Sequence, residues 1–202
     1  MASSLLRFAL AGTLLAAAPL PAAAQLGGSP GYQFLDAVRD DKGAEVDKIL
    51  AKPGSRIIDT RDPTTGETAL HIVAKRNDAK YIIYLLARGA DPNIKDNMGN
   101  TPLLVAIDHG YAGLIPLLLK GKANPNFVGD GGQTPLIKAV LRRDEEMVRA
   151  LLDGGADPDR KDYLAGKSAR DYANEDARSS VLAKLFKDVP VKPRRAVSGP
   201  TL

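Results

Sequence analysis

Two histidines are the side chains of this sequence best suited to acid–base or metal chemistry. His109 directly follows Asp108, and an Asp–His pair forms part of many hydrolase sites. Such a pair also needs a placed nucleophile, and adjacent residues on a helix point in different directions. The chain has no cysteine, which excludes a thiol nucleophile or a zinc–thiolate site. We therefore expect Asp108 and His109 to be a solvated pair rather than a catalytic one.

The carboxylates are numerous, but they stand where carboxylates have structural roles. Asp144 opens an Asp-Glu-Glu run at the start of a predicted helix, where negative charge suits the helix dipole. The segments "DNMGN" and "GDGGQ" lack the alternating ligands and the final glutamate of a calcium loop. No Gly-Lys-Ser/Thr follows "GDGGQT", as a phosphate-binding loop would require. The sequence thus predicts no catalytic site, no metal and no cofactor, and we do not expect an enzyme.

The composition is that of a folded chain with an aliphatic core. Hydrophobic residues make up 44% of the 202 residues and charged residues 26%, while aromatic residues contribute 5%. The net charge of +4 is too weak to indicate nucleic-acid binding without a clustered basic patch. Without cysteines the fold gains no stability from disulfides, so it must bury enough apolar surface by itself.

The first residues, "MASSLLRFALAGTLLAAAPLPAAAQ", are typical of a cleavable secretory signal. Arg7 precedes an apolar run from Phe8 to Ala18, and small residues end at Ala24 ahead of Gln25. We expect cleavage between Ala24 and Gln25, and export to the periplasm of a Gram-negative bacterium or secretion. The alternative is an uncleaved membrane anchor, but two prolines interrupt the run well before the roughly 20 apolar residues that a span needs.

Behind this leader the sequence repeats with a period of 33 residues. Three segments, "TGETALHIVAKRNDAKYIIYLLARGADPNIK", "MGNTPLLVAIDHGYAGLIPLLLKGKANPNFV" and "GGQTPLIKAVLRRDEEMVRALLDGGADPDRK", share their landmarks in register. The landmarks are Gly66, Gly99 and Gly132; Thr68, Thr101 and Thr134; Ala90, Ala123 and Ala156; and Pro92, Pro125 and Pro158. A further unit follows from Gly166 with one extra residue, and a helical half-unit precedes the series.

Each unit predicts a turn followed by two short helices. The glycine suits a tight turn with positive φ, the threonine suits a helix N-cap, and proline suits the first helical position. Leucine pairs such as Leu85 and Leu86 mark the buried stripe of the second helix. The glycines expected to end the second helices are Gly89, Gly121 and Gly154.

These landmarks resemble the ankyrin repeat. Its T-P-L-H-x-A signature appears as Thr101-Pro102-Leu103-Leu104-Val105-Ala106, as Thr134 to Ala139, and as Thr68 to Ala74 with one inserted position. The resemblance covers about residues 32–187 and implies an all-α solenoid of stacked helix–turn–helix units with β-turn or hairpin loops. It also implies that His71 ties neighbouring turns together by hydrogen bonds, which favours a structural role over a catalytic one. The last unit has Ser168-Ala169-Arg170 where inner units have Thr-Pro-Leu, which we interpret as a terminal unit adapted to water.

The repeat register divides the chain into consecutive segments. We expect a signal peptide at 1–24, a linker at 25–31, an N-terminal cap at about 32–62, repeats at about 63–95, 96–128 and 129–161, and a C-terminal cap at about 162–187. The tail at 188–202 carries Lys192, Arg194 and Arg195, which favours disorder over weak docking to an anionic surface.

Through the resemblance, function is expected on the concave face, which loop tips and first helices form. Twelve candidate partner-binding residues map to it: Thr65, Glu67, Lys75, Arg76, Met98, Asn100, Asp108, His109, Val128, Gln133, Leu141 and Arg142. Three of them, Met98, Val128 and Leu141, are either scattered apolar residues or a small apolar anchor ringed by charge.

The function expected from these features is non-catalytic binding of a protein partner by an exported monomer. No nucleic acid and no membrane span are expected after removal of the signal. One alternative is an inhibitor or immunity-type protein that caps another protein's active site with the same face. A periplasmic enzyme is the other alternative, and the sequence offers it no candidate nucleophile or metal site.

Overall fold

The computed structural model describes residues 28–51, 57–176, 180–187 and 189–190. The expected cleavage site at Ala24 and Gln25 and the basic residues of the tail lie outside this part of the chain. Within the described ranges the chain forms ten α-helices and no β-strand, which confirms the all-α fold class. They are α2 (Pro30–Arg39), α3 (Gly43–Leu50), α4 (Ala69–Lys75), α5 (Ala79–Ala87), α6 (Pro102–Asp108), α7 (Ile115–Lys120), α8 (Pro135–Leu141), α9 (Glu145–Asp153), α10 (Ala169–Glu175) and α11 (Ser180–Lys187). None of these helices has the length and apolar character to cross a bilayer.

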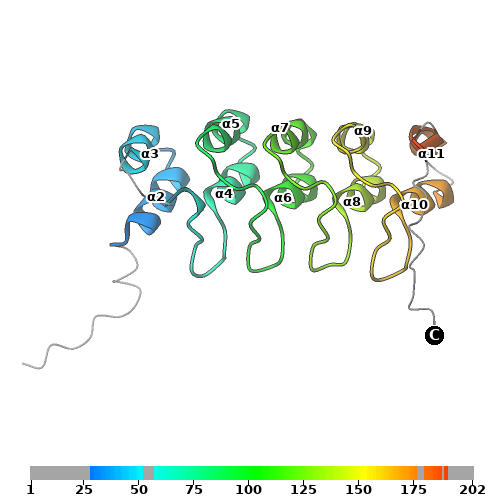
Figure 1. The fold of residues 1–202 in the computed structure, drawn as a ribbon, viewed down its shortest axis with the longest axis horizontal. Helices are drawn as coiled ribbons and strands as arrows, with labels where there is room; N and C mark the ends of the chain where they lie inside the picture. The colour runs from blue at the N-terminus through cyan, green and yellow to red at the C-terminus, as the bar shows by residue number, and fades with distance from the viewer. Residues whose placement is uncertain (1–27, 52–56, 177–179, 188, 191–202) are drawn as a thin grey trace, which may run out of the picture.

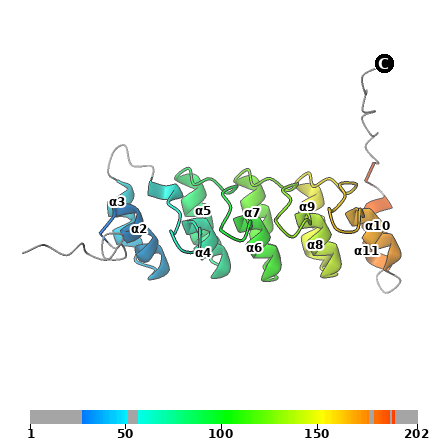
Figure 2. The same cartoon turned by 90° about the horizontal axis from the view of Figure 1, so that it is seen from below.

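The helices lie in two rows, and loops project from one side of them (Figure 1). We refer to α2, α4, α6, α8 and α10 as the inner helices, and to α3, α5, α7, α9 and α11 as the outer helices. Seen from below, the helix pairs follow one another in a single line from α2 and α3 to α10 and α11 (Figure 2). The molecule is therefore a solenoid in which each helix pair packs against the pair before it and the pair after it.

The inner helices begin where the repeat landmarks predicted. The hydroxyls of Thr101 and Thr134 accept hydrogen bonds from backbone N–H groups three residues on, and the prolines that follow take the first helical positions. Helices α4, α6 and α8 all have seven residues in the same register. The expected insertion in the first signature is therefore wrong, because Val73 simply stands where Ala106 and Ala139 stand.

Leucines at fixed repeat positions build the core. Leu103 and Leu136 of the inner helices have no exposed surface, and neither do Leu118 and Leu151 of the outer helices. The second leucine of each outer pair is only partly buried and packs from the side. Leu119, for example, fills the place that a Cβ on Gly154 would need, with its Cδ1 at 2.4 Å from that position. Gly154 thus permits close packing between neighbouring outer helices.

The outer helices end in a shared backbone motif. The chain passes into the left-handed region at Gly89, Lys122 and Gly155, with φ of 90°, 71° and 85°. In each case two backbone N–H groups after the helix donate hydrogen bonds to carbonyl oxygens of its last turn. In α7 these bonds run from Lys122 N to Leu119 O and from Ala123 N to Leu118 O. Gly121 and Gly154, which the sequence placed in this series with Gly89, have negative φ, and each is the residue before the left-handed one.

Four loops, which we term fingers, connect the helix pairs at residues 62–67, 96–100, 129–133 and 162–167. Gly66, Gly99 and Gly132 have φ of 73°, 75° and 75°, which confirms the predicted turns. Neighbouring fingers stack closely: a Cβ on Gly99 would lie 2.1 Å from Asp130 Cγ, and Asn97 N donates to Thr65 O at 2.9 Å. The stacking fixes the spacing of the fingers along the solenoid.

Arg170 of α10 corrects the interpretation of the terminal unit. Its side chain is only 16% exposed, and its Nε pairs with Asp159 Oδ1 at 2.7 Å. Its other donors reach the carbonyl oxygens of Phe186, in the last turn of α11, and of Val189, just beyond that helix. The charge replaces leucine because these oxygens and the Asp159 carboxylate accept its hydrogen bonds, and not because this position faces water.

Lys122 offers a test of the shared helix ending. Lys122→Gly should raise the free energy of unfolding by about 0.5–1 kcal/mol, because a Cβ in the left-handed region is strained. Gly89→Ala should lower it by about 1 kcal/mol, since no atom lies within 4 Å of the added Cβ and only the backbone conformation opposes it. Urea-induced unfolding followed by circular dichroism measures both. A lower midpoint for Lys122→Gly would contradict the strain.

Arg170→Leu restores the residue of the inner repeats and should nevertheless destabilise the chain by about 2 kcal/mol. The variant removes the arginine donors from the Asp159 carboxylate and from the carbonyl oxygens of Phe186 and Val189. Thermal unfolding measures the effect. Arg149→Leu on α9, where the arginine is exposed, is the control and should change little. A stable Arg170→Leu would restore the interpretation that this position merely faces solvent.

Candidate functional site

Four predicted residues meet at the ends of two neighbouring inner helices. Asp108 ends α6 and His109 caps it, while Leu141 ends α8 and Arg142 caps it. Arg142 Nη1 donates to Asp108 O at 3.1 Å, and Lys138 Nζ pairs with the Asp108 carboxylate at 2.8 Å. We call Asp108, His109, Lys138, Leu141 and Arg142 the central cluster. It combines both charges, an imidazole and a leucine that is 48% exposed, which suits a mixed polar and apolar contact.

Three other predicted residues are engaged within the protein. Glu67 is buried and pairs with Lys75 of the same unit. Arg76 donates to Val38 O at 2.9 Å and to Asp78 at 3.1 Å, so it joins the first helix pair to the second. A partner that contacted Glu67 or Arg76 would compete with these internal bonds.

The remaining predicted residues lie on or beside the fingers. Met98 is 68% exposed at a finger tip, and Thr65 holds the same register position one finger earlier. Asn100 and Gln133 are half-buried at finger bases, and Val128 is half-buried just before the third finger. Met98 on the second finger and Leu141 at the end of α8 thus belong to different units and to different parts of the repeat. The three apolar candidates do not form one compact anchor.

Ion pairs occupy the finger bases in the first and last units. Near the first finger Glu67 pairs with Lys75, and in the last unit Lys167 Nζ pairs with Glu175 Oε2 at 2.6 Å. Each pair joins a finger base to the far end of an inner helix. In the two middle units the finger-base residues are Asn100 and Gln133, and no such pair joins them to a helix end among the described residues. The middle of the face therefore keeps open polar and apolar side chains.

The sequence reasoning missed the two most exposed large side chains of the concave face. Tyr163 and Leu164 are 76% and 79% exposed on the fourth finger. Tyr172 of α10 steadies this finger, because its hydroxyl donates to Asp162 Oδ2 at 2.6 Å. That bond raises the pKa of Tyr172 to about 12 and lowers the pKa of Asp162. Leu164 holds the same position in the 33-residue register as Met98. The repeat register therefore could have predicted an exposed apolar side chain at Leu164, but the unit was interpreted only as a cap.

The two histidines have different surroundings. His109 is exposed and stacks on Tyr111, with ring centroids 5.7 Å apart. His71 is fully buried; Thr68 N donates to its Nδ1 at 3.1 Å, and its Nε2 bonds Asn100 O of the next finger at 3.0 Å. His71 thus links neighbouring units, as the resemblance implied. In the part of the chain that the structure describes, no group of three His, Asp or Glu side chains could hold a metal ion.

Burial of His71 predicts a loss of stability in mild acid. Burial lowers the pKa of His71 below its ordinary value of 6.5, although its bond to Asn100 acts in the opposite direction. The unfolded chain therefore takes up a proton first as the pH falls. Between about pH 7.5 and about pH 5.5 the free energy of unfolding should drop by up to about 1 kcal/mol on this account.

Urea titrations across that pH range measure the drop. His71→Leu removes the titrating group and places there the residue found at Leu104, so its unfolding should depend less on pH. An unchanged pH dependence in His71→Leu would show that other groups cause it.

Comparisons with known proteins agree with this architecture. A family model for ankyrin repeats in three copies matches residues 34–129 and 84–162. The chain is 37% identical over 89 residues to neurogenic locus notch homolog protein 2 of Homo sapiens, which covers 44% of this chain and 4% of that protein. It is 40% identical over 77 residues to oxysterol-binding protein-related protein 1 of Rattus norvegicus, covering 38% of this chain and 8% of that one.

A third relative is the nuclear factor NF-kappa-B p110 subunit of Drosophila melanogaster, 50% identical over 42 residues, or 21% of this chain and 4% of that protein. The chain therefore spans a small part of these relatives, and the similarity concerns the repeats. Ankyrin repeats generally mediate protein–protein interaction and are typically non-catalytic. Because the family model covers more than half of the sequence, this protein belongs to the ankyrin-repeat family.

Proposed function

We propose that this protein is an exported binding scaffold that holds a protein partner on the middle of its concave face. The observation that carries the proposal is the difference between the finger bases of the end units and those of the two middle units. Ion pairs occupy the finger bases in the first and last units, whereas Met98, Leu141 and Arg142 are exposed between them. Exposed apolar side chains beside arginine are typical of the centres of protein interfaces.

The central cluster gives this partner a chemical description. Lys138 neutralises Asp108, so the exposed side chains of His109, Leu141 and Arg142 are what the cluster offers to a partner. Tyr163 and Leu164 extend the apolar part along the finger tips. A partner surface with an apolar centre and an acidic group near Arg142 fits this arrangement.

Export rests on the sequence of the first 25 residues alone. The charged start, the apolar run and the small residues before Gln25 support a signal peptide and a periplasmic or secreted location. A bacterial source is part of the same proposal. Expression of the full chain followed by mass spectrometry of the exported protein tests the cleavage after Ala24.

The second candidate function uses the same face. A scaffold that covers the active site of another protein would act as an inhibitor or immunity-type protein. The two functions differ in their consequence, because an inhibitor lowers the activity of its partner and a scaffold does not. An enzyme of its own would turn over a substrate in purified form, and the sequence offers it no candidate nucleophile or metal site.

A triple variant tests the concave face directly. Met98→Ser, Leu141→Ser and Arg142→Ser together should abolish capture of the partner from an envelope extract, since they remove exposed anchors. All three residues are exposed, so circular dichroism should show the helices unchanged. A matched control on the outer helices, Arg149→Ser, Val181→Ser and Lys184→Ser, should capture the partner normally. Equal recovery by the triple variant and the wild type would disprove binding at this face.

A further inference from the structure

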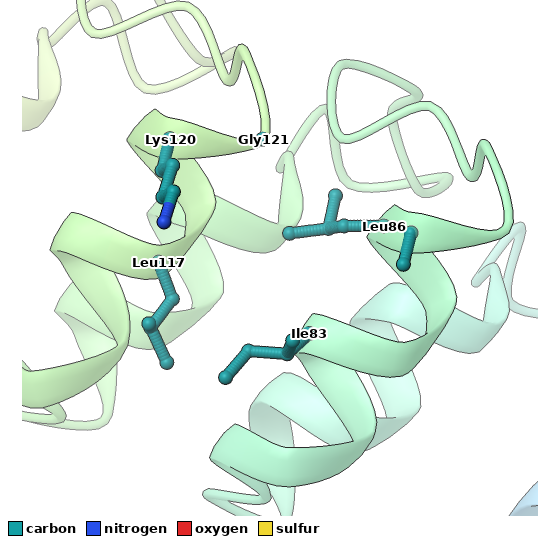
Figure 3. A pocket seen from close by; sticks show the side chains of 6 residues that line it. Ile83, Leu86, Leu117, Lys120 and Gly121 are labelled. Carbon is teal, nitrogen blue, oxygen red and sulfur yellow. The ribbon is translucent and has the colours of Figure 1, made fainter.

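A groove lies on the opposite side of the molecule, between the outer helices α5 and α7. It has a volume of about 280 Å³ and is open to solvent. In Figure 3 the side chains of Ile83 and Leu86 extend from α5 toward Leu117 and Lys120 of α7. Ile83 is 52% exposed, which is unusual for an isoleucine on a packed helix. Helices α5 and α7 thus leave an aliphatic surface between them that no described part of the chain covers.

The aliphatic lining of this groove is special to this pair of units, because the groove of about 270 Å³ between α3 and α5 is lined by Tyr81 and Tyr84. The register partners of Ile83 in the next two outer helices are Pro116 and Arg149, and Leu117 is matched by Ala150. Helix α7 is also short, because Pro116 has no N–H to donate to an earlier turn, and a 3-10 turn at Ala112–Leu114 takes the place of its first turn. The repeat architecture alone therefore does not account for an aliphatic groove at this one position.

One end of the groove carries two lysines. The Lys120 side chain lies at its rim and makes no ion pair or hydrogen bond with the described residues. A shallow continuation toward the loop after α5 includes Lys122, whose side chain likewise has no such partner. Asp91 also lines this continuation, where its carboxylate accepts the N–H of Asn93. Asp91 N in turn donates to Asp59 Oδ1 at 2.9 Å, which places a second carboxylate beside this end. Within the lining itself, two lysines stand against one carboxylate.

Lys122 occupies its place at an energetic cost. It has φ of 71°, whereas glycine holds the equivalent left-handed position at Gly89 and Gly155. A side chain in this conformation is strained, and Asp41, Asn77 and Arg143 adopt it after other helices with φ of 57°, 58° and 58°.

We propose that this groove docks an amphipathic helix of a protein partner. The helix presents two aliphatic residues one turn apart to Ile83, Leu86 and Leu117, and its acidic residues reach Lys120 and Lys122. A further helix packed between two outer helices continues the helix-on-helix packing of the solenoid. This second surface is independent of the concave face.

Fluorescence anisotropy with a synthetic peptide tests the proposal. The probe is a labelled helical peptide with two leucines one turn apart followed by two glutamates, added to the full chain. Lys120→Glu should weaken binding about tenfold. Ile83→Ser should weaken it similarly, and Lys122→Gly should weaken it while stabilising the fold. Lys184→Glu, an exposed lysine of α11, is the control and should bind as the wild type does.

A peptide with lysines in place of the glutamates completes the test. It should bind the wild type weakly and bind Lys120→Glu more tightly. Equal binding of the two peptides by the wild type would overturn the proposal, as would no saturable binding up to about 1 mM. Tight binding of laurate at the groove would assign it to a lipid, and self-association lost in Ile83→Ser would assign it to a second copy. The concave triple variant should bind the peptide normally, so failure here would not bear on the proposed function.

Discussion

The side chains of Leu85, Leu118 and Leu151 have no exposed surface. They are fully buried only because a neighbouring helix pair packs against the helix pair to which each belongs. A helix pair of this size cannot cover its apolar stripe alone, so the stability of every unit depends on its neighbours. Burial of one leucine side chain contributes about 1.5–3 kcal/mol, and the register of 33 residues repeats that contribution along the chain. The threonine caps, finger glycines and helix endings recur because each of them keeps this contact in register.

Surfaces outside that contact differ from unit to unit. At the end of the inner helices one register position carries Lys75, Asp108 and Leu141 in turn, which changes the concave face from paired charge to an exposed leucine. On the outer side another position carries Ile83, Pro116 and Arg149, which produces a groove at one interface. A uniform core thus supports two surfaces of different chemistry, and both proposals of binding rest on such local departures from the repeat.

Helix caps and turns, which depend on residues adjacent in the sequence, were predictable from the sequence. Contacts that a long side chain makes with a distant part of the chain were not. The caps at Thr101 and Thr134 and the turn at Gly99 follow from local backbone rules, so spacing alone located them. Arg170 was misinterpreted because its acceptors lie on another helix. The burial of Glu67 depends on Lys75 folding back along α4, a choice of rotamer that the residue type does not reveal. The partner-binding roles of the predicted site residues remain predictions.

Hydrogen–deuterium exchange of the full chain, alone and bound to its captured partner, tests the central claim most directly. If the middle of the concave face holds the partner, backbone amides of the fingers at 96–100 and 129–133 and around Arg142 should become protected. Amides of α9 and α11 should exchange at the same rate in both states. Protection confined to the outer helices, with unchanged exchange in these fingers, would contradict the concave-face account.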